Sequence, residues 1–256
     1  MSLELFGKNR PIIGEDFASQ RLTVPFKDNT ARMNRVSPKL IKDAGTPNLF
    51  IKVPQGAMAR ASLSGAKYAF DFTIALFGIV FLMPLFLIIA LLIILDSKGN
   101  PIFTQVRTGL GGKQFKIWKF RTMSVRECGL NMTQAQRGDA RVTRIGKFLR
   151  QTSIDELPQL INVLNGEMSL VGPRPHAIAH DIHFGTLINE YCERFRVRPG
   201  ITGLAQISGA RGPTPSISKM AARVKFDLEY VEKWSLLLDL KILFKTLVSF
   251  TSHDAF

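Results

Sequence analysis

Cysteine is scarce in this sequence: there are two, Cys128 and Cys192, far apart and outside any CxxC spacing. A disulfide framework and a thiolate zinc site both need cysteines at defined spacings, so the sequence supports neither. The pair is typical of reduced thiols in a protein that faces the cytosol.

Other familiar signatures are also missing. The amino terminus lacks the apolar core and the small-residue cleavage site of a signal peptide. The chain contains no GxxxxGKS/T loop and no GxGxxG fingerprint, so a nucleotide would have to be bound by another scaffold. His176, His180 and His183 lie close together but complete no familiar zinc spacing, which favours supporting or surface roles.

Acidic residues are few: 20 Asp and Glu stand against 34 Lys and Arg, which gives a formal charge of +14. Such a charge indicates an anionic partner, and three classes fit: a nucleic acid, an anionic lipid surface or a phosphorylated small molecule. At 256 residues, the chain has room for one domain of ordinary size and a membrane segment.

Long hydrophobic runs are absent except for one, from Phe72 to Leu95, with Pro84 at its middle. As a helix rising ~1.5 Å per residue, this run matches the ~30 Å hydrocarbon core of a bilayer. Proline removes a backbone donor and clashes with the preceding turn, so we expect a membrane break at Pro84. Each half is then too short to span alone, which leaves a kinked helix that crosses or a hairpin that returns.

Basic residues on both flanks favour the hairpin. Residues 1–67 hold eleven Lys or Arg against five Asp or Glu, and Lys98, Arg107 and Lys113 follow the run. Because basic flanks stay on the cytoplasmic side, we expect both ends of the run there.

The pattern along the chain predicts three parts: a flexible basic arm (1–62), a re-entrant membrane hairpin (63–97) and a cytosolic domain (98–256). Two β-rich pieces around a glycine cluster in 101–123 predict a β-hairpin, and helical periods dominate the rest. The expected fold class is therefore α/β, mostly α with a small β-hairpin.

The last helical pattern, after Trp234, has two faces. Seven apolar side chains share a broad face, while Lys241 and Lys245 lie on another. Such a helix either lies in a membrane interface or packs as an ordinary core helix, and the upstream apolar run favours the interface.

An acidic pair, Asp155 and Glu156, lies just before Pro158, a residue that suits the first turn of a helix. Carboxylates at the positive end of a helix stay ionised. An ionised aspartate is a competent nucleophile toward phosphorus, and its neighbour can hold Mg²⁺, which prefers one or two carboxylates plus substrate phosphate oxygens. The structural alternative is a capping box formed by Ser153 and Glu156.

Four arginines stand beside segments with a constrained backbone. Guanidinium groups bind phosphate oxygens in a geometry that lysines do not offer. A single arginine is more often a surface salt-bridge partner, but four in such positions support a phosphate site. They are Arg121, Arg150, Arg174 and Arg198.

At these segments the chain resembles the bacterial sugar transferase family, the polyprenyl-phosphate hexose-1-phosphate transferases, also called monotopic phosphoglycosyl transferases. The similarity extends from about Lys67 to Thr246. Besides the apolar run with its central proline, it covers PIFTQVRTGLGGKQFKIWKFRTM (101–123), TRIGKFLRQTSIDELPQLINVLNGEMSLVGPRP (143–175), RPGITGLAQISG (198–209) and WSLLLDLKI (234–242). So many long motifs in one order are specific for the family and less so for the sugar.

The resemblance implies a re-entrant helix-break-helix, a compact cytosolic catalytic core over 98–256 and interfacial amphipathic helices. It implies a Mg²⁺-dependent reaction in which Asp155 attacks the sugar-linked phosphate of a UDP-sugar and releases UMP. The sugar phosphate then passes from the aspartate to undecaprenyl phosphate. Glu156 is the Mg²⁺-linked partner by this resemblance, and Arg150, Arg174 and Arg198 are phosphate or nucleotide contacts.

The implied partners are a UDP-sugar, undecaprenyl phosphate and the bacterial inner membrane, with the catalytic domain on its cytoplasmic face. No nucleic acid is expected, and a homodimer stays open. The segment RVKFDLEYVEKWS (223–235) is most similar to members that start exopolysaccharide or capsule repeat units, with glucose expected before galactose.

The chain departs from the family pattern at two places. These are Lys67-Tyr68, where relatives often have Lys-Arg, and Met83-Pro84, where many have Ser-Pro. The missing serine hydroxyl bears on the stability of the hairpin.

Two rival hypotheses stay open at this point. One is a membrane-anchored basic adaptor of polysaccharide machinery, which needs no catalysis and tolerates Asp155→Asn. The other is an enzyme that transfers the sugar phosphate directly, with Asp155 only binding metal, and that therefore forms no labelled protein.

Overall fold

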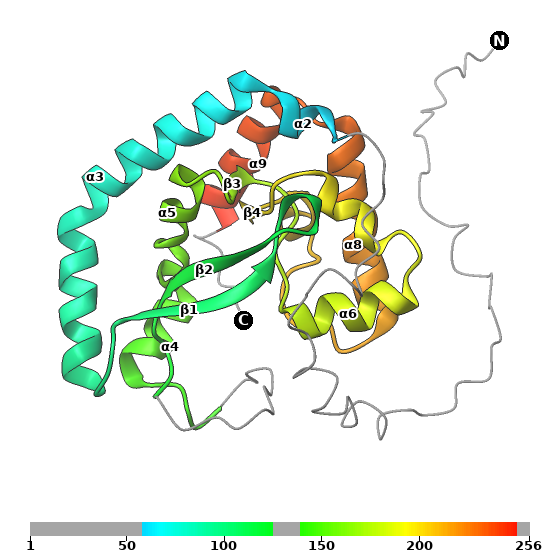
Figure 1. Ribbon diagram of the computed structural model, residues 1–256. Helices are drawn as coiled ribbons and strands as arrows, with labels where there is room; N and C mark the ends of the chain where they lie inside the picture. Colours follow the sequence, from blue (N-terminus) through cyan, green and yellow to red (C-terminus); the bar gives the residue numbers. More distant parts are fainter. Residues whose placement is uncertain (1–57, 125–138, 250–256) are drawn as a thin grey trace, which may run out of the picture. The chain divides into compact units, whose positions relative to one another are not determined.

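The structure is a computed structural model that describes residues 58–124 and 139–249, all within the compact unit Thr46–Phe256 (Figure 1). Most of the predicted basic arm lies outside the described residues. The described residues are mostly helical with a small antiparallel sheet, which confirms the fold class in its coarse form. The helices are α2 (Arg60–Leu63), α3 (Gly65–Asp96), α4 (Arg144–Gln151), α5 (Gln159–Leu164), α6 (Ile178–Leu187), α7 (Leu204–Ile207), α8 (Ile217–Lys233) and α9 (Leu236–Ser249), with 3₁₀ turns η3 (Leu110–Gly112), η4 (Ile154–Glu156) and η5 (Tyr191–Arg196).

The predicted β-hairpin is confirmed. Strands β1 (Ile102–Thr108) and β2 (Gln114–Phe120) pair antiparallel, and η3 connects them. Gly111 and Gly112 in this connection have φ of 62° and 78°, which residues with a β-carbon adopt at a cost. A second pair, β3 (Ser169–Val171) and β4 (Gly200–Thr202), is parallel and joins two motifs that are distant in the sequence.

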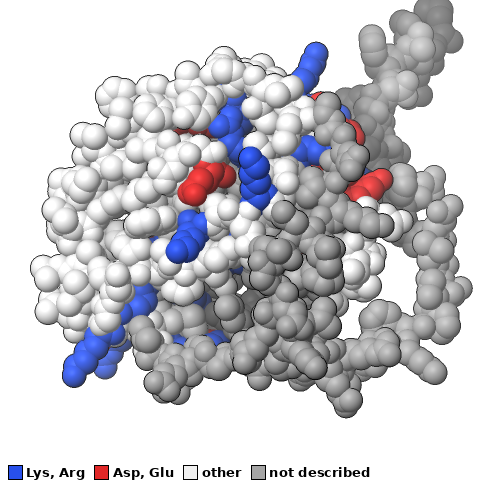
Figure 2. Space-filling view, viewed as in Figure 1, with Lys and Arg blue, Asp and Glu red and all other residues white. Residues whose placement is uncertain are grey.

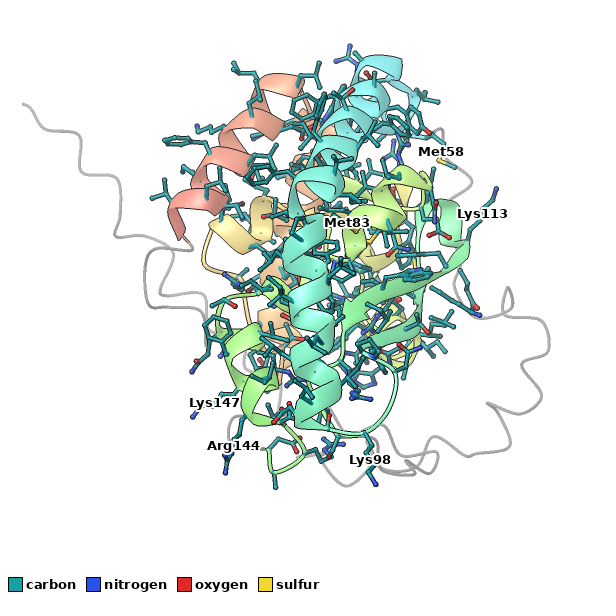
Figure 3. The ribbon with its side chains drawn as sticks, turned by 90° about the vertical axis from the view of Figure 1, so that its left-hand side faces the viewer. Met58, Met83, Lys98, Lys113, Arg144 and Lys147 are labelled. Atoms are coloured by element: carbon teal, nitrogen blue, oxygen red, sulfur yellow. The ribbon has the colours of Figure 1, made fainter. Side chains whose placement is uncertain are left out.

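Helix α3 contains Pro84 and is a single element of 32 residues, not two separate helices. It bends about halfway along its length (Figure 1), close to Met83 (Figure 3). Proline removes one helical hydrogen bond and pushes the preceding turn away, which accounts for a bend without ending the helix. The predicted interruption of the helix at Pro84 is therefore wrong, because the helix continues through this residue and only bends.

The outer surface of α3 is apolar. The helix is long and apolar enough to cross a membrane, and only 11% of its most apolar stretch is buried. Figure 2 shows a broad area over α3 without charged side chains. A patch of this size on a folded protein marks a contact with lipid or with another protein. Its most exposed side chains are Phe77, Val80, Phe81, Leu87 and Leu95.

Polar contacts hold both ends of α3 to the rest of the unit. At its beginning, the buried Lys67 ammonium donates to an Asp239 carboxylate oxygen of α9 at 2.7 Å. At its end, the guanidinium of Arg121 donates to the backbone carbonyl oxygens of Ser97 and Lys98, the latter at 3.0 Å. Both ends of the apolar helix are thus bound to one and the same folded body.

The first half of α3 also packs against the main core. This core includes side chains from α3, β2, α5, β3, α8 and α9, among them Ala75, Ile117, Leu160, Tyr230 and Ile242. The packing fixes α5 beside β2, and η4 contacts both β2 and α4. The core therefore places the acidic pair, which belongs to η4, next to the β-hairpin.

The closing pattern forms α8 and α9, separated at Trp234 as predicted. In α9 the predicted apolar face is exposed, with Leu237 at 76% and Phe244 at 69%. Asp239 and Ile242 on the other side are fully buried. The core-packing alternative holds for the opposite face and for Leu243, which packs against the main core. The rest of the broad apolar face is largely exposed, including Leu240, Leu247 and Val248.

Candidate active site

The acidic pair lies in η4, whose entry residue Ser153 has φ of 55°, the one left-handed non-glycine residue among those described. The Ser153 hydroxyl makes no capping bond and instead accepts from the guanidinium of Arg211 at 2.7 Å. The capping-box alternative is therefore wrong, because the serine that should cap the helix binds an arginine. A strained backbone at this place is typical of a functional turn.

Glu156 is held by two cations. The guanidinium of Arg174 donates to both carboxylate oxygens, with Nη1 at 2.8 Å from Oε2. The ammonium of Lys119 donates to Oε1 at 2.8 Å. Burial raises the pKa of Glu156, but the charges and hydrogen bonds of Arg174 and Lys119 outweigh it and hold this pKa well below its ordinary value. Glu156 is thus a permanent anion with both oxygens occupied.

Asp155 differs from Glu156 in its hydrogen bonds and in the direction of its pKa shift. Its side chain is 9% exposed and accepts no hydrogen bond from the described part of the chain. Burial and the charge of Glu156 raise the pKa of Asp155 to about 6, against the opposing charges of Lys119, Arg174 and Arg150. At neutral pH, which lies above this pKa, most of the molecules therefore carry a buried carboxylate without a hydrogen-bond donor at this position.

The positive end of a helix is not the main support of these charges. The position of Pro158 predicted that a helix would begin at the acidic pair. Asp155 and Glu156 instead lie in a single 3₁₀ turn, and α5 begins later, at Gln159. Burial and the charge of Glu156 raise the pKa of Asp155 against the neighbouring cations, whereas the same cations outweigh burial at Glu156.

The four predicted arginines divide into two groups. Arg174 binds Glu156, and Arg150, whose Nε donates to the Thr122 hydroxyl at 2.8 Å, acts on Asp155 through its charge. Arg121 instead binds the carbonyl oxygens that end α3. The guanidinium of Arg121 therefore binds the end of α3 and is not among the proposed phosphate contacts.

Arg198 lies apart from the acidic pair. Its guanidinium stacks on the ring of Tyr68, near the start of α3, 5.2 Å from the ring centroid. Its charge acts on Tyr230 and is not among those that set the pKa of Asp155 or Glu156. Tyr68 stands where relatives often have an arginine, and its aromatic ring makes a cation–π contact with Arg198.

The sequence did not reveal the residues that support Arg174. The buried Arg194 donates from Nη2 to the backbone carbonyl oxygen of Arg174 at 2.7 Å. Arg194 is itself paired with the buried Asp227 at 2.8 Å. No signal in a single sequence joins Lys119 to Glu156 or pairs Arg194 with an aspartate 33 residues away. Asp227 and Arg194 fix the turn from which Arg174 reaches Glu156.

The fit of a Mg²⁺ ion to these residues is partial. Among residues 58–124 and 139–249, no group of three or more His, Cys, Asp or Glu gathers as a metal cage. Mg²⁺ is often bound by one or two carboxylates plus phosphate oxygens, and the unpaired oxygens of Asp155 meet that requirement. Both oxygens of Glu156 already accept from Arg174 and Lys119, so Glu156 could bind an ion only after releasing one of them.

A family model described as "Bacterial sugar transferase" matches residues 62–253, three quarters of the chain and the whole of the site. The chain belongs to the bacterial sugar transferase family. The family resemblance seen in the sequence is thereby confirmed, and so is the prediction of a sugar transferase enzyme.

Curated proteins similar to this chain carry names that fit this family. The chain is 49% identical to the UDP-glucose:undecaprenyl-phosphate glucose-1-phosphate transferase of Caulobacter vibrioides over 201 residues, 78% of this chain and 75% of that protein. It is 50% identical to the Escherichia coli protein of the same name over 198 residues, 76% of this chain but 43% of that protein. It is 47% identical to the exopolysaccharide production protein PSS of Rhizobium leguminosarum over 72% of this chain and 94% of that one. The chain thus spans less than half the length of the Escherichia coli relative.

Proposed function

We propose that this sugar transferase moves glucose 1-phosphate from UDP-glucose to undecaprenyl phosphate, as the first step of exopolysaccharide repeat-unit synthesis. The names of the relatives support the two substrates. The observation that carries the chemistry is Asp155: a buried carboxylate with no hydrogen-bond donor, a pKa raised to about 6 and three cations around it.

In the first step, a carboxylate oxygen of Asp155 attacks the glucose-linked phosphorus of UDP-glucose. The bond from this phosphorus to the bridging oxygen breaks, and that oxygen leaves with UMP. An aspartyl glucose-phosphate remains on the enzyme. A carboxylate stripped of water and of hydrogen-bond donors is the more reactive nucleophile, and burial of Asp155 supplies this condition.

In the second step, a phosphate oxygen of undecaprenyl phosphate attacks the same phosphorus. The bond to Asp155 breaks, the carboxylate is restored, and the product is undecaprenyl diphosphate glucose. No external oxidant, reductant or proton donor is needed, because each step exchanges one phosphorus–oxygen bond for another.

The cations have a double role in this proposal. Lys119, Arg174 and Arg150 outnumber the two carboxylates, so the site keeps a net positive charge. Such a site attracts a diphosphate and stabilises the charge that develops on phosphorus. Glu156 holds Arg174 and Lys119 in place and so orients both cations toward the reacting group.

We propose Asp155 as the protein ligand of Mg²⁺, together with phosphate oxygens of the substrate. The ion would supply charge neutralisation for the diphosphate and the leaving UMP. Removing divalent ions with EDTA should then abolish turnover, and Mg²⁺ should restore it. Full turnover in EDTA would remove the ion from the proposal and leave the roles of Asp155 and Arg174 intact.

The membrane placement that we propose is a re-entrant one, with α3 as the inserted element. A helix that crosses a bilayer separates its ends by ~30 Å of hydrocarbon. Here Lys67 at one end and the carbonyl oxygens of Ser97 and Lys98 at the other contact the same folded body. These contacts of both ends with one body support a bent helix that enters the bilayer and returns to the same face.

Basic side chains at the end of α3 support a cytoplasmic position of this body. Lys98, Arg144 and Lys147 gather there (Figure 3), and all three are exposed. Exposed lysines and arginines beside an apolar insertion lie at anionic headgroups and stay on the inner face. The proposed location is therefore the cytoplasmic face of the inner membrane.

The test of the function is UMP release by the full chain in lipid nanodiscs with Mg²⁺, undecaprenyl phosphate and a panel of UDP-sugars. UDP-glucose should give the highest turnover, and Asp155→Asn should give none. Glu193→Gln, which removes a carboxylate from a surface ion pair, is the matched control and should retain turnover. Absence of UMP release from every UDP-sugar would refute the proposal and favour the adaptor hypothesis.

A further inference from the structure

A groove of ≈ 420 Å³ lies among α7, the end of α8 and α9, and none of its lining residues belongs to the acidic pair or its cations. Its apolar lining comes from Leu204, Ile207, Leu237, Leu238 and Ile242. A shallow apolar groove of this kind is lined for a hydrocarbon chain rather than for a polar solute.

Positive charge surrounds this groove. Lys233, Lys241 and Lys245 line it, against a single carboxylate, Glu229, which pairs with Lys233 at 3.0 Å. Lys241 and Lys245 are exposed and have no carboxylate partner among residues 58–124 and 139–249. Two unpaired ammonium groups, four residues apart on one helix, thus stand beside an apolar groove.

The groove continues into an exposed apolar surface. Leu237 lines the groove and is 76% exposed, and Leu240 and Phe244 continue the same face of α9. Figures 1 and 3 show α9 beside the first half of α3, and the Lys67–Asp239 contact joins the two helices. The surface is therefore continuous with the proposed membrane-inserted element.

We propose that this groove binds an anionic phospholipid of the bilayer. The headgroup phosphate lies between Lys241 and Lys245, and an acyl chain follows Leu204, Ile207 and Leu238. A soluble phosphate would leave the apolar lining without a function, and a zwitterionic lipid would not balance the two ammonium groups. This inference rests on the membrane placement in the proposed function and adds a lipid site separate from the reaction.

Trp234 provides a local probe, because Lys233 and Ser235 on either side of it both line the groove. The chain has two tryptophans, so Trp118→Phe leaves Trp234 as the single tryptophan, which is excited selectively. The full chain in this background is placed in phosphatidylcholine nanodiscs. Brominated phosphatidylglycerol or brominated phosphatidylcholine is then titrated in, since bromine on an acyl chain quenches a tryptophan that it contacts.

The expected result is quenching at a lower mole fraction of brominated phosphatidylglycerol than of brominated phosphatidylcholine. Lys241→Gln with Lys245→Gln should reduce this preference by about tenfold, because each ammonium at the surface attracts anionic lipid. The matched control is Lys219→Gln with Lys225→Gln, which removes two exposed lysines of α8 outside the groove and should keep the preference.

Three results would overturn the lipid site. Equal quenching by both lipids in the unaltered groove would show no selectivity, and equal losses in both double variants would show general charge attraction. Abolition of the preference by a trace of undecaprenyl phosphate would assign the groove to the acceptor. Asp155→Asn separates this claim from the catalytic one, since it should stop turnover and leave the quenching curves unchanged.

Discussion

The guanidinium of Arg174 donates to both carboxylate oxygens of Glu156, and both charged groups act on the neighbouring Asp155. Burial and the charge of Glu156 raise the pKa of Asp155, whereas the charge of Arg174 lowers it. The two adjacent carboxyl groups therefore have opposite properties: one is paired and always ionised, the other is unpaired and near its titration point. Pairs of titratable groups with separated pKa values are typical of catalytic sites.

Arg174→Lys should lower kcat by about a hundredfold, because a lysine cannot bind both oxygens of Glu156 at once. UMP release in nanodiscs measures the change. Arg144→Lys on the exposed surface of α4 is the matched control and should retain turnover. If Arg174→Lys turns over like the unaltered chain, the two-oxygen contact has no part in catalysis.

The rate should depend on pH through Asp155. Its pKa is about 6 and the carboxylate is the reactive form, so kcat/KM should fall as the pH decreases below about 6. Glu156→Gln removes the like charge and frees Arg174 and Lys119, and both changes favour the ionised form of Asp155. The acid limb should therefore move to lower pH in Glu156→Gln, even though turnover decreases. If the acid limb of the kcat/KM profile lies at the same pH in Glu156→Gln, Asp155 is not the group whose titration the profile reports.

Asp155→Asn should make the protein more stable at neutral pH. The folded-state pKa of Asp155 is raised above its ordinary 3.8, so the unfolded chain ionises at lower pH and ionisation costs folding free energy. The cost accumulates between about pH 4 and pH 6 and amounts to about 1–3 kcal/mol above that range. Thermal unfolding in detergent at pH 7.5 should show a higher Tm for Asp155→Asn, and the gain should vanish near pH 4. A lower Tm at pH 7.5 would contradict the raised pKa.

The sequence predicted local elements better than contacts between distant ones. The β-hairpin and the α8–α9 boundary follow from periodicity and glycines, which act over a few residues. The parallel pairing of β3 with β4 and the support of Arg174 by Arg194 depend on tertiary packing, which no local pattern reports. Arg121 shows the same limit, because its proximity to a motif suggested phosphate whereas the fold brings it to the end of α3.

The re-entrant placement predicts that both ends of α3 face the cytoplasm. Cysteines are introduced singly at Gly65, where an added β-carbon meets no atom within 4 Å, and at the exposed Lys98. In a background with Cys128→Ser and Cys192→Ser, neither site should react with a membrane-impermeant maleimide in intact spheroplasts. Both should react after lysis.

Labelling of one end alone in intact spheroplasts would establish a crossing helix and refute the re-entrant placement. A cysteine at a known periplasmic site of another membrane protein in the same cells controls for access of the reagent. Catalytic turnover of each cysteine variant shows that the chain is folded.

The covalent intermediate is the most direct test of the mechanism. The full chain is incubated with Mg²⁺ and UDP-glucose in the absence of undecaprenyl phosphate, and its intact mass and peptides are measured. The proposed mechanism predicts a glucose-phosphate adduct on Asp155, one UMP released per adduct, and loss of the adduct when undecaprenyl phosphate is added. An active enzyme that releases UMP only with the acceptor present, and never carries the adduct, would contradict it.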